Sequence, residues 1–578
     1  MKEGEGQVVL LSGEPGIGKS RLVEALKETV EHEGAGCLEL RCSPYAQNSA
    51  LYPVIEHVQR FLQFQQEDSP EAKLRKLEAT LVGAPGRAPL HEIVPLFAAL
   101  LSLPHPAGCP PLSLSPQKQK EKTQEALVAW LCTEAKQQAV TYAWEDLHWA
   151  DPSTLELLTL FLNQVPTTRL LAVLTYRPEF TPPWGVHSYL SQLTLSRLGR
   201  SHVETMVEEV IGGKALPKEV VQQIVSKTDG VPLFVEELTK MVVESGLYVG
   251  AQHAAPLPSL GIPTTLHDAL MARLDRLGPA KEIAQMGATI GREFNYDLLQ
   301  AVSPLNEETL QRGLRQLVEA ELVYQSGIPP QARYLFKHAL VQETAYQSLL
   351  KSRRQQLHQQ VAQVLAEQFP ETVETQPELV AHHYTEAGLI AQAIPYWQRA
   401  GQRSLEHSAN VEAVTHLTTG LELLKTLPDT PERVQEELIL QTTLGHALTA
   451  TKGWSNPGVG AAYARSLELC QQVGDSSQLS QVLVGLLSFY VEVPQFQTAQ
   501  ELGEQLLSLA QKTHDQPLLE EAHLVLGFTL FLQGEIASAR DHLQQGIVPH
   551  ASPQGRSRAI LYGYDPRVPN WFVMACAL

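Results

Sequence analysis

The chain has little of what marks secreted or membrane-spanning proteins. Its 578 residues include only six cysteines, scattered at positions 37, 42, 109, 132, 470 and 576 without a Cys-x-x-Cys pair. Reduced structural thiols are therefore expected, which suits a cytoplasmic protein. No apolar run reaches the ~18 residues of a membrane span, and residues 1–5 lack the apolar stretch of a signal peptide. We expect a cytoplasmic chain with no membrane contact.

Positive charge is also scarce. The 44 Lys and Arg residues face 63 Asp and Glu residues, which gives a formal net charge of -19 at pH 7. Such an acidic total argues against broad binding to nucleic acid or to anionic membranes. The strongest basic run, Lys351-Ser352-Arg353-Arg354, is better explained as a solvated helix face. Hydrophobic residues make up 43% of the chain, as in globular proteins, and the length implies about three or four domains.

A glycine-rich stretch near the N-terminus carries the strongest functional signal. It consists of Gly13, Glu14, Pro15, Gly16, Ile17, Gly18, Lys19 and Ser20, which fit the phosphate-binding loop G-x-x-x-x-G-K-[ST]. An apolar, β-prone segment precedes it and residues 21–26 have helical spacing, which is the context this loop requires. The glycines allow positive φ, so that backbone N–H groups and the helix N-terminus point at phosphates. We expect ATP or ADP with Mg²⁺, with Lys19 on the β- and γ-phosphates and Ser20 Oγ on the metal.

An acidic pair follows another predicted strand, at residues 140–144. ATP hydrolysis needs one carboxylate near the Mg²⁺ shell and a second that orients or activates the attacking water. Glu145 is expected at the metal position and Asp146 at the water position. The alternative is an exposed acidic pair that begins a helix.

A further predicted strand, at residues 170–175, is followed by Arg177. Residues at the C-terminal ends of parallel strands face the crevice where ligands bind. Arg177 is therefore expected to sense the γ-phosphate, and the alternative is a surface arginine in the turn before Pro178. Residues 7–42 read as strand, loop, helix and strand, which predicts a parallel sheet, and residues 53–136 read as a helical insertion.

The rest of the chain is predicted to be helical. Small residues recur about 40 positions apart at Gly445, Gly485 and Gly527, which indicates stacked helical hairpins with a concave face for proteins or peptides. The expected fold is an α/β P-loop NTPase core at 1–198 followed by all-α modules. These are a helical lid at 199–250, a winged-helix-like domain at 262–350, a tetratricopeptide-like α-solenoid at 352–550 and an irregular, truncated tail at 551–578.

These motifs together resemble the STAND class, the signal-transduction ATPases with numerous domains, which carry an origin-recognition-like AAA ATPase domain. More closely, they resemble the ATPase-plus-repeat half of bacterial adenylate/guanylate cyclase fusion proteins. The resemblance rests on residues 13–21, 145–151, 176–178 and 230–233, and it extends from about residue 4 to residue 548. It implies slow ATP hydrolysis and a switch from a closed to an open form when a ligand binds the repeats. It also implies nucleotide-dependent self-association.

The resemblance assigns further residues to the nucleotide. Arg21 belongs to the matching loop string, Pro232 of the Gly-Val-Pro motif would lie against the nucleotide, and His338 matches a winged-helix histidine that touches phosphate in some members. The family's Gly-Arg-Glu segment before the first strand has no counterpart here, and neither has a cyclase domain. We therefore expect a fragment of a longer protein, with a cyclase-type output domain upstream and more repeats downstream. Two alternatives are an ATP-dependent transcription regulator of the large LuxR kind and a repeat scaffold with a degenerate loop.

Overall fold

The computed structural model describes residues 5–65, 68–82, 90–110, 114–135, 138–212, 216–244, 263–473 and 478–546. The expectation of an irregular tail at 551–578 lies outside these residues. Within them, no helix is both long enough and apolar enough to cross a membrane. The described cysteines at positions 37, 42 and 109 are free thiols.

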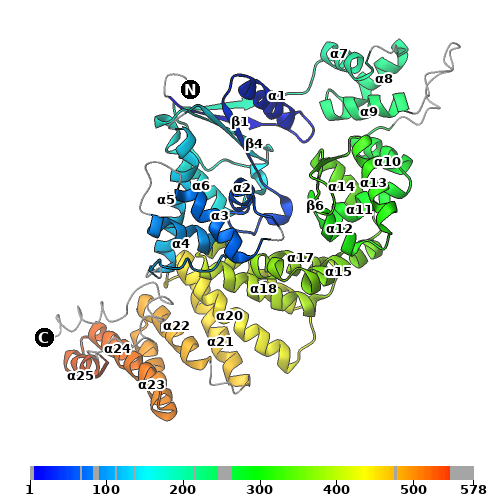
Figure 1. The fold of residues 1–578 in the computed structure, drawn as a ribbon. Helices are drawn as coiled ribbons and strands as arrows, with labels where there is room; N and C mark the ends of the chain where they lie inside the picture. The colour runs from blue at the N-terminus through cyan, green and yellow to red at the C-terminus, as the bar shows by residue number, and fades with distance from the viewer. Residues whose placement is uncertain are drawn as a thin grey trace.

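A five-stranded parallel sheet forms the first part of the molecule (Figure 1). Its strands are β1 (Gln7–Ser12), β2 (Gly36–Arg41), β3 (Val140–Glu145), β4 (Leu170–Tyr176) and β5 (Leu190–Thr194), in the order β2-β3-β4-β1-β5. Every pair is parallel. The predicted parallel sheet is confirmed, but the sequence analysis missed β5. That strand lies at the sheet edge and four of its five residues are exposed, so it lacks the apolar run of a buried parallel strand.

Helices cover the sheet and give it a continuous core. They are α1 (Lys19–His32), α2 (Tyr52–Phe61), α3 (Pro70–Val82), α4 (Leu90–Leu100), α5 (Pro116–Ala135) and α6 (Pro152–Leu162). All six residues of β3 are buried, and the Tyr142 and Trp144 rings on this strand pack against Phe161 of α6. The acidic end of β3 is therefore fixed by a packed strand. The described residues between β2 and β3 are mostly helical, as predicted.

Two smaller units follow the α/β domain. The first contains α7 (Arg200–Val210), α8 (Lys218–Thr228) and α9 (Pro232–Glu244). The second contains α10 (Leu266–Arg276), α11 (Pro279–Ile290), α12 (Tyr296–Val302), α13 (Glu307–Glu319) and α14 (Ala339–Gln347), with strands β6 (Glu293–Asn295), β7 (Val323–Ser326) and β8 (Arg333–Phe336). Its sheet is antiparallel in the order β6-β8-β7, so helices are followed by a hairpin as the sequence predicted. We call this second unit the hairpin unit.

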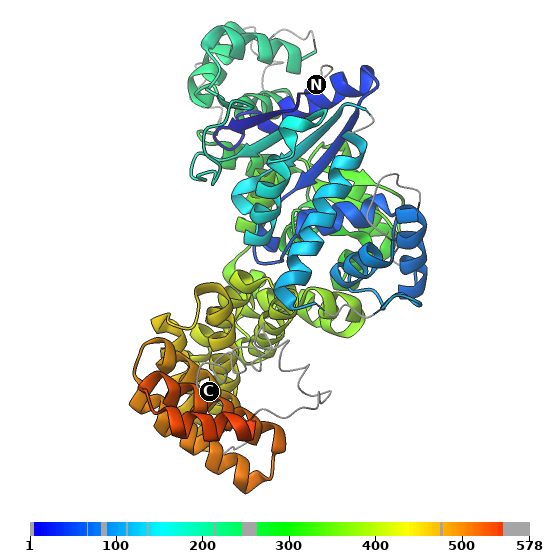
Figure 2. The same ribbon diagram turned by 90° about the vertical axis from the view of Figure 1, so that its left-hand side faces the viewer.

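The remaining helices form a stacked array that extends away from the sheet (Figure 2). They are α15 (Lys351–Gln368), α16 (Pro370–Thr375), α17 (Pro377–Glu386), α18 (Ile390–Glu406), α19 (Asn410–Leu424), α20 (Pro431–Lys452), α21 (Pro457–Val473), α22 (Leu479–Glu492), α23 (Phe496–Thr513), α24 (Gln516–Gln533) and α25 (Ile536–Gly546). The repeated glycines serve close packing. A Cβ on Gly445 or Gly485 would come within 2.7 and 2.4 Å of the Tyr463 ring, and one on Gly527 within 2.7 Å of Leu543. The predicted α/β core followed by helical repeats is confirmed.

Candidate functional site

The glycine-rich loop lies between β1 and α1, and α1 begins at Lys19. Gly16 and Gly18 have φ values of 78° and 103°, a region that side chains with a Cβ rarely enter. Lys19 is 8% exposed, and its Nζ donates to the carbonyl oxygens of Gly13 at 2.6 Å and Glu14 at 3.1 Å. Burial lowers the pKa of Lys19, and the Asp146 carboxylate offsets part of that effect. The lysine therefore lies inside the curve of the loop, close to the acidic end of β3.

The two residues expected on the metal are in direct contact. Ser20 Oγ donates to Glu145 Oε2 at 2.6 Å, and Glu145 is 2% exposed. Arg41 Nη2, at the end of β2, lies 3.3 Å from Glu145 Oε1. Burial raises the pKa of Glu145, and the Arg41 guanidinium opposes that rise. A hydroxyl and a carboxylate at this separation are the hard oxygen donors that Mg²⁺ prefers, so this residue pair fits the metal.

Asp146 has a different set of contacts. Its backbone lies in the left-handed region, with φ 60°, and its N–H donates to Thr175 Oγ1 of β4 at 3.0 Å. Its carboxylate accepts a hydrogen bond at 2.5 Å from Nη1 of Arg292, which lies in the hairpin unit just before β6. The sequence analysis did not select Arg292, because no local motif marks a partner 146 residues away.

Arg177 and a further residue, His148, complete the polar cluster. The Arg177 guanidinium lies over the Trp149 ring, 4.9 Å from its centroid. Both ring nitrogens of His148 are buried without a hydrogen-bond partner in the described structure. Burial lowers the pKa of His148 to about 4. The nearby Asp146 carboxylate opposes this shift, whereas the positive charges of Arg177 and Lys19 add to it. The motif containing His148 was recognised from the sequence, but its histidine was not singled out.

The α7–α9 unit contacts the loop directly. The Leu233 N–H donates to the carbonyl of Gly16 at 3.1 Å, and Pro232 begins α9 beside it. Pro232 therefore lies next to the loop. Arg21 lies elsewhere: its side chain is exposed and its Nη1 is 3.3 Å from Glu28 Oε1 on the same helix.

His338 precedes α14 in the hairpin unit. Its Nε2 is buried without a partner in the described structure. Burial lowers the pKa of His338 to about 4, and charges on Glu236, Lys337 and Arg292 lie near it. The histidine is thus close to the arginine that binds Asp146.

The first repeats are docked on the α/β domain near the acidic segment. Glu412 of α19 is 2% exposed, and its Oε1 accepts from the N–H of Ser153, at the start of α6, at 2.9 Å. Arg403 of α18 donates to Ser102 Oγ at 2.8 Å. Ser49 hydrogen bonds to Glu378 of α17. The acidic segment 146–153 is therefore connected to the hairpin unit by Arg292 and to the repeats by Glu412.

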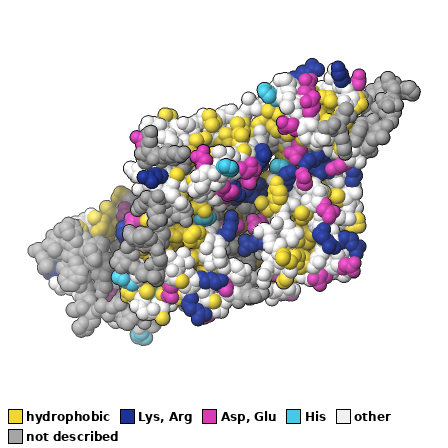
Figure 3. All heavy atoms as spheres, turned by 45° about the horizontal axis from the view of Figure 1, so that its top comes forward, with side chains coloured by type: hydrophobic (Ala, Val, Ile, Leu, Met, Phe, Trp, Pro, Cys, Tyr) yellow, Lys and Arg dark blue, Asp and Glu magenta, His cyan; other side chains and the backbone are white. Residues whose placement is uncertain are grey.

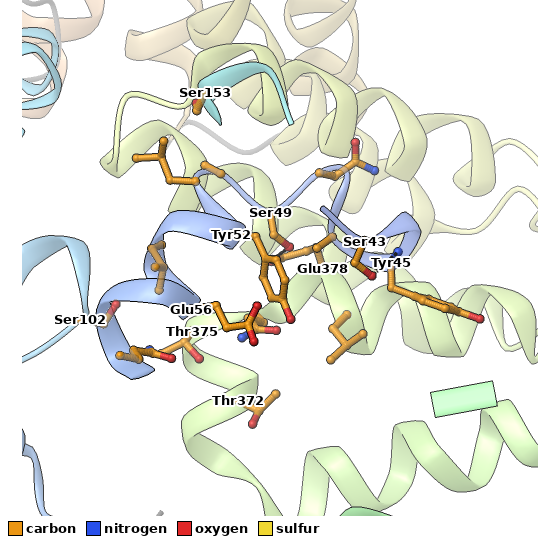
Figure 4. A pocket seen from close by; sticks show the side chains of 18 of the residues that line it. Ser43, Tyr45, Ser49, Tyr52, Glu56, Ser102, Ser153, Thr372, Thr375 and Glu378 are labelled. Carbon is orange, nitrogen blue, oxygen red and sulfur yellow. Dashed lines mark hydrogen bonds between the residues drawn. The ribbon is translucent and has the colours of Figure 1, made fainter. Parts of the chain in front are cut away.

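A cavity of about 400 Å³ lies where the α/β domain, the hairpin unit and the first repeats meet. Figure 4 shows Tyr52 and Glu56 side by side on α2, with Thr372 and Thr375 of α16 across from them. Burial, followed by the nearby Glu293 carboxylate, raises the pKa of Glu56. Arg41 and Arg292 also line the cavity, so it is adjacent to the side chains that contact Glu145 and Asp146.

Three comparisons place these features among known proteins. Residues 1–174 match the family model of the AAA ATPase domain. An uncharacterized protein of Rhizobium meliloti (strain 1021) is 24% identical over 584 residues, which cover all of this chain and 56% of that protein. The chain therefore spans little more than half the length of this relative.

Solved structures align with most of the chain at low identity. A STAND protein with a tetratricopeptide repeat sensor from Pyrococcus horikoshii is 11% identical, with a TM-score of 0.36, over 99% of this chain and 84% of that one. A Walker-type ATPase of Pyrococcus abyssi is 14% identical, with a TM-score of 0.22, over 58% of this chain and 90% of that one.

The parallel sheet, the glycine-rich loop after β1 and the family match agree with one another. Residues 1–174 match an AAA ATPase domain, and stacked helical repeats follow it in the chain. The AAA ATPase part of the resemblance expected from the sequence is confirmed.

Proposed function

We propose that the chain is a signal-transduction switch that binds ATP and Mg²⁺ at the loop 13–20 and hydrolyses ATP slowly. The contact between Ser20 Oγ and Glu145 Oε2 at 2.6 Å carries the proposal. It pairs a hydroxyl with a buried carboxylate beside Lys19, as a Mg²⁺–nucleotide site requires. Bound Mg²⁺ would neutralise phosphate charge, held by Ser20 and Glu145. Lys19 would exchange its two carbonyl partners for phosphate oxygens.

The remaining site residues take roles that follow from their positions. Asp146 orients the attacking water: the water oxygen bonds to the γ-phosphorus, the bond to the ADP oxygen breaks, and Asp146 takes the water proton. Arg177 senses the γ-phosphate from the end of β4. Gly13, Gly16 and Gly18 let the loop backbone approach the phosphates. Pro232 lies against the nucleotide. His338 contacts phosphate in the closed form, in which the repeats are docked on the α/β domain.

The repeats are proposed to bind a protein or peptide ligand that shifts the molecule from the closed form to the open form. Stacked helical repeats provide an extended concave surface for such a partner. Nucleotide-dependent self-association and a cyclase-type output domain encoded upstream belong to the same proposal, as does a cytoplasmic setting. Binding to nucleic acid is not part of it. On the face in Figure 3, basic side chains alternate with acidic ones and form no continuous basic band.

Nucleotide binding and turnover by the purified chain test this function. We expect ATP and ADP to bind in the presence of Mg²⁺. Lys19→Ala should weaken ATP binding about 100-fold without unfolding the chain, because the side chain supplies charge-assisted bonds to phosphate and little core packing. Lys27→Ala, on the same helix, is the matched control. Unchanged ATP affinity in a folded Lys19→Ala protein would remove the assignment.

A further inference from the structure

Arg292 reaches the candidate catalytic acid from outside the AAA ATPase domain. Its Nη1 donates to Asp146 Oδ2 at 2.5 Å, and the two side chains are only 8% and 14% exposed. Ionic hydrogen bonds of this length are among the strong ones in proteins. The contact therefore occupies one oxygen of Asp146 in a site largely closed to water.

The two ends of this contact are fixed to different units. The Arg292 carbonyl accepts from the N–H of Phe336 on β8 at 3.0 Å, which ties the arginine backbone to the small sheet. The Asp146 N–H is held by Thr175 on β4. The ion pair must therefore break whenever the hairpin unit moves away from the AAA ATPase domain.

The arginine is only partly satisfied in this position. Its Nε is buried without a hydrogen-bond partner in the described structure, which is a cost that a purely stabilising contact would avoid. Buried ion pairs are weak evidence of stabilisation, because desolvation opposes the attraction. A role in controlling Asp146 accounts for a buried arginine at this point better than stability does.

We propose that Arg292 is a positioning residue that withholds Asp146 from the attacking water, so that hydrolysis requires separation of the hairpin unit from the AAA ATPase domain. The inference depends on the function proposed for Asp146. A carboxylate oxygen that accepts a hydrogen bond from a guanidinium has lost the lone pair that would orient the water. Removing the arginine frees that oxygen.

The test compares steady-state turnover of Arg292→Gln with that of the parent protein. We expect kcat to rise about tenfold while the Kd for ATP stays within about twofold, because Asp146 acts on water rather than on nucleotide binding. Arg312→Gln, an exposed arginine of α13 paired with Glu308, is the matched control and should behave like the parent. An unchanged or lower kcat in folded Arg292→Gln would overturn the inference.

A double variant separates this role from a structural one. Arg292→Gln should not accelerate turnover in an Asp146→Asn background, because its effect passes through the carboxylate. Acceleration that persists there would overturn the inference. If Arg292→Gln does not fold, Arg292→Lys keeps the charge but lacks the forked geometry, and its kcat should exceed that of the parent by a smaller factor. A folded Arg292→Lys no faster than the parent would also overturn it.

The same variants distinguish failure of this inference from failure of the proposed function. Asp146→Asn as active as the parent would remove the role assigned to Asp146, and with it the proposed function of that residue. Asp146→Asn slower than the parent, with Arg292→Gln unchanged, would overturn only the role of Arg292.

Discussion

The two halves of the candidate site differ in what holds them in place. The loop 13–20 is held by contacts of the AAA ATPase domain itself and of the adjoining α9, through Lys19, Ser20 and Leu233. The acidic segment 146–153 also has contacts within its own domain, through Thr175, but Arg292 of the hairpin unit and Glu412 of the repeats bind it as well. Under the proposed function, this difference predicts that nucleotide binding depends on local contacts, whereas hydrolysis depends also on contacts between the units.

The largest expected effect is on turnover, from a substitution in the acidic segment 146–153. Asp146→Asn should keep nucleotide binding but lower turnover by about 100-fold or more, because the amide is nearly isosteric yet cannot take a proton. Separate measurements of ATP affinity and of phosphate release check this. Glu156→Gln, an exposed acid on α6, is the control. A parallel loss of affinity would show that the two halves are not separable.

The connection to the repeats gives the next effect. Glu412→Ala removes the acceptor of the buried Ser153 N–H, so the unfolding free energy should fall by about 1–3 kcal/mol. Urea denaturation measures this loss, with Glu422→Ala, an exposed glutamate of the same helix, as the control. Equal stability of the two variants would mean that the repeats are not held through this contact.

Arg177 tests whether the candidate site distinguishes ATP from ADP. Arg177→Ala should weaken ATP binding about tenfold more than ADP binding, because its proposed partner is the γ-phosphate. Titrations with both nucleotides measure the ratio, and Arg169→Ala, an exposed arginine before β4, serves for comparison. Equal losses for both nucleotides would remove the sensor role.

Lowering the pH should destabilise the folded protein through a buried histidine in the first repeats. His416 of α19 is buried beside the Trp397 ring and near the backbone of Ala400 and Asn48, and burial lowers its pKa from 6.5 to about 4. The stability it contributes is therefore present above pH 6.5 and is lost as the pH falls toward 4. Between about pH 7.5 and about pH 5.5 the loss is about 1 kcal/mol.

His416→Gln removes this titration. The melting temperature of the variant should fall less on acidification than that of the parent, and the exposed His202→Gln should fall as the parent does. Identical pH profiles for His416→Gln and the parent would place the acid sensitivity at other buried histidines.

Local signals in the sequence were enough to predict that the loop 13–20 lies between a strand and a helix. The spacing of glycines and Lys19 between a strand and a helix is set by contacts a few residues apart, and so is the acidic end of β3. The small residues of the repeats reveal helix pairing for the same reason. The exposed edge strand β5 gave no such signal. It forms by pairing with β1, and it has no apolar run of its own that would mark it in the sequence.

The contacts of the acidic half were not accessible from the sequence. Glu412 reads as an ordinary acid in the first turn of a helix, where it favours the helix dipole, and Arg292 reads as a surface residue in a turn. Their importance arises from docking between units far apart in the chain. His148 was within a recognised motif, but only the structure shows that both of its ring nitrogens are buried without partners among the described residues.

The most direct test asks whether the nucleotide bound at the loop changes the contacts of the acidic segment 146–153. It measures hydrogen–deuterium exchange in two complexes that hold different nucleotides. The parent protein would be compared with Mg²⁺ and ADP and with Mg²⁺ and a non-hydrolysable ATP analogue. We expect residues 13–20 to be protected by both ligands, and residues 151–153, 291–293 and 410–413 to exchange faster with the ATP analogue. Equal exchange of these three segments with both nucleotides, despite protection of the loop, would contradict the account.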